Sequence, residues 1–153
     1  MNRRWMGLLV VVVAVCLVGQ AAFGGGIRSI GLRVVLPIGN APFLLGLEAR
    51  GDLAFGVATG SFFLSAEGKA LITISCDLRL GSNDAAAKTF VRLTTGLVYF
   101  DRTRYLPSLL VGGGVTLEVP VSPVLAVAVA GEFIYPFAFP VPMVSASGRW
   151  VFP

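Results

Sequence analysis

The chain has 153 residues, of which 56% are hydrophobic and 13% are charged, and its formal net charge is +4. Soluble domains carry about 25% charged residues, so this composition, with a mean hydropathy of +0.84, indicates a membrane protein. The length suits one domain, and the charge is too mild to indicate nucleic-acid binding. The absence of histidine excludes Ser-His and Cys-His catalytic systems and histidine-based metal sites.

The N-terminal segment is predicted to be a signal peptide. Two arginines in residues 1–5 precede an apolar run, and the small residues after that run offer a cleavage site. The predicted organisation is a signal peptide over residues 1–22 and an outer-membrane barrel domain over residues 23–153. A retained anchor helix and a lipoprotein are the alternatives, although Val15 before Cys16 departs from the small residue of a lipobox.

The rest of the chain is divided by Pro, Gly, Asn and Asp into short segments in which apolar and polar residues alternate. Each is about 8–12 residues long, the length with which a tilted strand crosses a bilayer. A helical membrane protein is the alternative, but its best window, residues 106–131, is interrupted by three prolines and a Gly-Gly-Gly run. The predicted strands cover, in chain order, residues 27–36, 43–50, 53–64, 70–80, 89–100, 108–119, 124–134 and 142–152.

Charged residues inside these strands share one face, and the opposite face stays apolar. In the fourth strand Asp77 and Arg79 alternate with Cys76 and Leu78, so the two sets point to opposite sides of the sheet. Cys76 is expected to act as a small hydrophobe, and leucine at position 79 is expected to destabilise the fold. The third strand has no charge, and its inward face is predicted to carry Ala54, Gly56, Ala58 and Gly60.

Two observations place the charged face inside a closed barrel, with lipid outside. The charged face consists largely of Gly, Ala, Ser and Thr, which suit a narrow lumen. Its five arginines and four carboxylates nearly balance, as enclosed charges must, and arginine suits multiply hydrogen-bonded pairing. The predicted lumen charge network, structural in role, consists of Arg33, Glu48, Arg50, Asp77, Arg79, Arg92, Glu118, Glu132 and Arg149.

Aromatic residues gather near the predicted strand ends, where aromatic belts of a membrane barrel lie. Core aromatics of a soluble barrel would give a similar pattern, so this observation is the weakest of the three. The residues concerned are Phe43, Phe62, Phe63, Tyr99, Phe100, Tyr105, Phe133, Tyr135, Phe137, Phe139, Trp150 and Phe152.

The alternation along the chain, and the closing strand SASGRWVFP, resemble the small eight-stranded outer-membrane β-barrels of the outer membrane protein A, X and W type. The resemblance implies an all-β fold, an eight-stranded antiparallel up-and-down transmembrane barrel, located in a bacterial outer membrane. It also implies two partners, the lipid bilayer and the barrel-assembly machinery, which would read Trp150 and Phe152. Pro153 after the terminal phenylalanine departs from the family pattern.

The sequence predicts no catalytic, cofactor-binding or metal-binding residue, and the chain is expected not to be an enzyme. Every carboxylate of the predicted network has arginine neighbours, so salt bridges are expected rather than acid–base chemistry. The expected function is a structural or envelope role, with the lumen closed by the charge network. A narrow passage for small or apolar solutes and a secreted soluble β-barrel that binds an apolar ligand are the alternatives.

Overall fold

A computed structural model describes residues 26–39, 43–53, 56–66, 70–81, 86–99, 108–135 and 140–152, so the predicted signal peptide lies outside the described residues. Eight strands are present, as predicted, and their bounds agree with the prediction to within three residues. In chain order they are β1 (Ser29–Pro37), β2 (Leu44–Leu53), β3 (Gly56–Ser65), β4 (Ala70–Leu80), β5 (Lys88–Tyr99), β6 (Ser108–Ser122), β7 (Leu125–Tyr135) and β8 (Val141–Val151).

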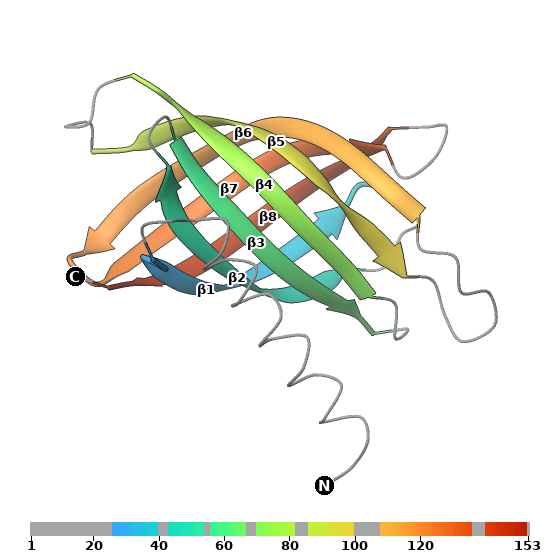
Figure 1. Cartoon of the computed structure of the whole chain (residues 1–153), viewed down its shortest axis with the longest axis horizontal. Coiled ribbons are helices and arrows are strands. Elements are labelled where there is room, and N and C mark those ends of the chain that lie inside the picture. Colours follow the sequence, from blue (N-terminus) through green and yellow to red (C-terminus); the bar gives the residue numbers. More distant parts are fainter. Residues whose placement is uncertain are drawn as a thin grey trace, which may run out of the picture.

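The strands close into a single antiparallel barrel in sequence order, β1 to β8, with β8 paired back to β1 (Figure 1). Closure leaves no unpaired sheet edge, so the backbone polar groups of every strand are hydrogen-bonded to a neighbour. Strands wind obliquely around the barrel in Figure 1. No helix among the described residues is long and apolar enough to span a membrane.

The strand β6 is longer than predicted because it continues through a proline. Pro120 pairs with Ala126, and the register then shifts before Ser122 pairs with Leu125. A bulge of this kind accommodates a residue that cannot donate to the ladder. The Ser122 hydroxyl accepts a hydrogen bond from the Val124 amide at 3.3 Å, which supports the tight turn into β7.

The outer face of the barrel is apolar, and the strand β7 shows the pattern most simply. Its residues alternate between exposed and buried along the whole strand. Val127 and Val129 point outward and are exposed, whereas Ala126, Ala128 and Ala130 point inward and are buried. The charged face predicted from the sequence is therefore the inner one, and a lipocalin-like arrangement, with its apolar face inside, is not what the chain forms.

The prediction for the third strand was wrong in phase. The inward-facing residues of β3 include Thr59, which contacts Arg50, and Phe63, which lies in the lumen. Gly56, Ala58 and Gly60 occupy the opposite phase, because Thr59 pairs with the inward residue Ser75 of β4. Ala54 lies outside the described residues. The residues on both faces of β3 are small or apolar, and none of them is charged. Alternation within this strand therefore did not distinguish its inner face from its outer face.

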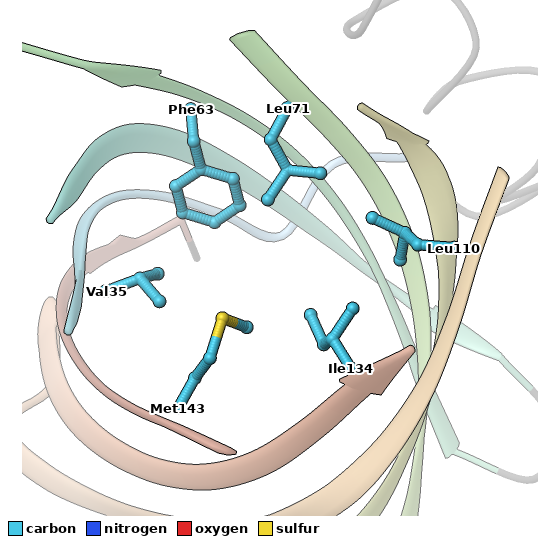
Figure 2. Packing of buried hydrophobic residues seen from close by; sticks show 6 residues of the cluster. All are labelled: Val35, Phe63, Leu71, Leu110, Ile134 and Met143. Atoms are coloured by element: carbon cyan, nitrogen blue, oxygen red, sulfur yellow. The ribbon is translucent and has the colours of Figure 1, made fainter. Parts of the chain in front are cut away.

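The lumen has two chemically different halves. At the end of the barrel away from the described chain ends, apolar side chains point into the interior from six strands (Figure 2). In the remainder, buried hydroxyls and charged residues predominate, together with Phe90 and the alanines of β7. We call the first half the apolar plug; its members are Val35, Phe63, Leu71, Leu110, Ile134 and Met143.

Glycine makes room for the bulkiest side chain of the plug. Gly46 of β2 pairs with Phe63 of β3, and the phenyl ring lies over the glycine backbone. A Cβ atom at position 46 would overlap the ring and the Phe62 carbonyl oxygen. A narrow barrel therefore holds a large ring only where the neighbouring inward position has no side chain.

Candidate functional site

The centre of the polar half is a doubly hydrogen-bonded ion pair. Asp77 of β4 lies directly opposite Arg92 of β5 in the register of the sheet. Arg92 donates from Nε to Asp77 Oδ1 at 2.6 Å and from Nη2 to Asp77 Oδ2 at 2.7 Å. Both side chains are 0% exposed. Two parallel charge-assisted bonds of this kind hold both planes in one orientation.

The network extends across the lumen through Arg50. This guanidinium donates to Asp77 Oδ2 at 3.1 Å and to the Thr59 hydroxyl at 3.2 Å, and it also pairs with Glu118. Arg50 lies on β2 and Glu118 lies on β6, which are opposite strands of the closed barrel. The pair therefore spans the width of the lumen and ties its two walls together.

Two further arginines complete the set from the strands that close the barrel. Arg149 of β8 pairs with both Glu48 and Glu118. Arg33 of β1 pairs with Glu132 of β7 and donates to the Ser145 hydroxyl at 3.0 Å and 2.8 Å.

A contact of 3.2 Å between Arg92 Nη1 and Glu132 Oε1 joins the parts into one chain of alternating charges. We call this set the ionic chain; its members are linked in the order Arg33, Glu132, Arg92, Asp77, Arg50, Glu118, Arg149 and Glu48.

The ionic chain is electrically neutral, because its four arginines match its four carboxylates. The sequence had predicted one extra positive charge, from Arg79. That residue is on the inward phase of β4, but it lies near the strand end and is exposed. The structure thus brings eight of the nine predicted residues together and leaves Arg79 outside the enclosed set, because phase alone does not state how deep in the lumen a residue lies.

Arg79 lies instead at the mouth of the barrel nearest the described chain ends. Its guanidinium lies 5.7 Å from the centroid of the Phe90 ring, which Arg50 also approaches at 5.5 Å. A cavity of about 190 Å³ opens at this mouth. Lys88 and Glu118 line it together with these three residues, so this end of the ionic chain adjoins the cavity.

Three buried polar atoms in the lumen have no hydrogen-bond partner within the described part of the chain: Glu48 Oε2, Ser61 Oγ and Thr116 Oγ1. Glu48 and Ser61 face each other across β2 and β3. Ordered water commonly satisfies such atoms in polar interiors.

The ionic chain cross-links the strands of the barrel through salt bridges. Each carboxylate accepts a hydrogen bond from at least one guanidinium, so all four carboxylates are held in ion pairs. Within the described ranges, no group of three or more Cys, Asp or Glu side chains gathers as a metal site would require. Removing one member of such a buried pair leaves the other unpaired, which costs about 3–5 kcal/mol.

No protein-family model matches the chain, and no curated protein sequence matches it. The barrel is similar to the N-terminal β-barrel domain of Pseudomonas aeruginosa OprF, with a TM-score of 0.68 and 10% identity over 84% of this chain and 98% of that one. The chain has the fold of the small outer-membrane β-barrels.

Two other solved structures support this fold. Neisserial surface protein A has a TM-score of 0.56 and 14% identity, over 82% of this chain and 95% of that one. Ail of Yersinia pestis, in a phospholipid bilayer nanodisc, also has a TM-score of 0.56, with 13% identity over 83% of this chain and 99% of that one. The predicted eight-stranded antiparallel barrel is confirmed.

The predicted aromatic belts require outward side chains, and Phe63 does not meet this requirement. Phe43, Phe133 and Trp150 are exposed on the barrel, but Phe63 is buried in the apolar plug. Tyr135 and Phe152 are exposed as well, and Phe62 is buried on the outward phase of β3. Four residues lie outside the described ranges, and the side chain of Tyr99 is not described; the four are Phe100, Tyr105, Phe137 and Phe139.

The apolar plug was not predicted from the sequence, although the phase rule contains the signal for it. Val35 shares its phase with Arg33, and Ile134 shares its phase with Glu132. Large apolar residues on the inward phase therefore predict an apolar layer inside the barrel. The positions of the charged residues carry no signal for this layer.

Proposed function

We propose that this chain is an integral protein of a bacterial outer membrane with a structural, non-enzymatic role in the envelope. The observation that carries the proposal is the ionic chain, in which seven buried charges and the partly exposed Glu118 balance one another inside a barrel whose exterior is apolar. An ionic interior with an apolar exterior is the arrangement that a bilayer selects. The fold neighbours support the same environment.

The ionic chain also supports a closed lumen. Arg50 and Arg149 both bind Glu118 from other strands, so the charged side chains bridge the lumen rather than line it. A hydrated solute would have to separate several buried pairs at once, and each separation leaves charges without partners. A narrow passage remains the second candidate, because the cavity at the mouth adjoins Arg50 and Glu118.

Export and assembly follow from the same proposal. Residues 1–22 would be removed as a signal peptide, leaving residues 23–153 as the barrel. In the last strand, Trp150 points outward and Phe152 follows it, both exposed. These two residues are the ones that the barrel-assembly machinery would recognise, and the outward aromatic positions would meet the lipid interface.

Three measurements on the full chain, expressed in a bacterium with an outer membrane, test the proposal. It should fractionate with the outer membrane, migrate differently on gels with and without boiling, and show no channels in planar bilayers. A chain found folded and monomeric in detergent-free buffer would overturn the membrane assignment. Channel openings from the purified protein would favour the passage instead.

A charged residue introduced on the outer face would distinguish a membrane barrel from a soluble one. Val129 of β7 is exposed on the outer face. Lysine at this position should destabilise a barrel whose outside meets lipid, by about 2–4 kcal/mol near the bilayer centre. In a soluble barrel the same Val129→Lys substitution would be harmless. The matched control is Val129→Leu, which should behave as wild type in both cases.

A further inference from the structure

We propose that the apolar plug is a second seal of the lumen, independent of the ionic chain and sufficient by itself to block ions. This inference deepens the proposed function and rests on it, because it assumes a barrel that spans a bilayer. It assigns the block to a cluster of six buried side chains that are all apolar.

Burial of the plug residues is the first observation. Val35 and Leu110 are each 1% exposed, and Phe63 is 2% exposed. These side chains come from three different strands, and Leu71, Ile134 and Met143 come from three more. Figure 2 shows all six pointing inward from the surrounding ribbon. The wall residues Leu44 and Val141 pack against them.

The position of the plug is the second observation. Phe63 adjoins the ionic chain through Arg33, whose guanidinium lies 5.7 Å from the centroid of the ring. Ser61 lies two residues before Phe63 on β3 and is fully buried. Thr59, two residues before Ser61, accepts a hydrogen bond from Arg50. The two seals are thus stacked along the barrel axis, with the plug at one end and the charged layer nearer the other.

The two seals work by different physical means. The ionic chain blocks the lumen through side chains that are held by opposite charges, and neutralising substitutions release that hold. An apolar constriction excludes ions because they would have to shed hydration without receiving polar partners. Loss of the ionic chain should therefore leave the plug, and the block to ions, in place.

The test compares four full-length proteins in planar bilayers. The first is the wild type, and the second carries Arg50→Gln with Glu118→Gln, which removes one charge of each sign and with them the pair that spans the lumen. The third carries Phe63→Ala with Leu110→Ala, which removes bulk from the plug. The fourth combines all four substitutions. Each must show the boiling-dependent gel shift of a folded barrel before its conductance is compared.

A matched control uses the same residue types on the outer face. Phe133 and Leu109 are neighbours in sequence of plug residues but point outward, with exposed fractions of 55% and 67%. Replacing both by alanine removes the same bulk without opening the lumen. This control should conduct no more than the wild type, alone and combined with the Arg50 and Glu118 substitutions.

We expect no channel openings from the wild type or from either double variant, and channel openings from the quadruple variant alone. Openings from the Arg50 and Glu118 variant with an intact plug would overturn the inference, as would a folded quadruple variant that shows no openings. Openings from the wild type would instead overturn the closed barrel of the proposed function. If Phe63→Ala prevents folding, Val35→Ala with Leu110→Ala replaces that pair.

Discussion

The pair between Asp77 and Arg92 offers the sharpest test of how the lumen is held together. In the variant Arg92→Met, Asp77 loses two hydrogen bonds of 2.6 Å and 2.7 Å and keeps Arg50 at 3.1 Å. Glu132 loses its 3.2 Å contact with Arg92 and keeps Arg33. All of these groups are buried, so the expected loss of unfolding free energy is about 3–5 kcal/mol.

A second substitution distinguishes lost pairing from lost packing. Arg92→Met leaves the Asp77 carboxylate without its main partner. Adding Asp77→Asn replaces that carboxylate by a neutral amide, so part of the lost stability should return. Residues in direct contact show coupling energies of about 0.5–3 kcal/mol in such cycles. The control is Leu93→Met, on the adjacent outward position, where the side chain is 57% exposed. It should change stability by less than about 0.5 kcal/mol.

The assay is urea unfolding of the barrel in lipid vesicles, followed by tryptophan fluorescence. The chain contains two tryptophans, and removal of residues 1–22 would leave Trp150 as the single tryptophan. It points outward, so its emission reports departure from lipid. A loss below about 1 kcal/mol for Arg92→Met, or a double variant no more stable than the single one, would refute the reasoning from buried pairing.

Three further predictions use the same unfolding assay. Arg79→Leu should cost less than about 1 kcal/mol, because Arg79 is exposed at the mouth; a cost equal to that of Arg92→Met would place it in the enclosed network. Gly46→Ala should cost about 1–3 kcal/mol through overlap with Phe63, whereas Gly148→Ala, with open space around it, should be neutral; equal effects would contradict the packing argument. Phe63→Ala should cost about 3–5 kcal/mol, and a cost below about 1 kcal/mol would mean that the plug is not packed.

The ion pairs depended on barrel closure in ways that the sequence did not reveal. Arg33 and Glu132 lie on β1 and β7, which are separated by β8 in the barrel. Arg50 reaches Glu118 across the full width of the lumen. Such partners depend on strand tilt, on register and on the length of the arginine side chain. None of these properties can be read from the alternation of residues within one strand.

What the sequence determined by itself was the number of strands, their approximate bounds and the face that carries charge. Those properties follow from local alternation and from turn residues, which act within a strand and its neighbours. Local alternation could not determine which face of β3 points inward, because its two faces differ little in polarity. Only the contact with Arg50 and the pairing with Ser75 determine it.

Depth in the lumen was decided by the tertiary structure alone. Asp77 and Arg79 share a phase, yet one is fully buried in the ionic chain and the other is exposed at the mouth. Val35 and Arg33 share a phase as well, yet one belongs to the plug and the other to the charged layer. A period of two residues states which side of the wall a residue faces, and only closure of the tilted strands determines what it meets there.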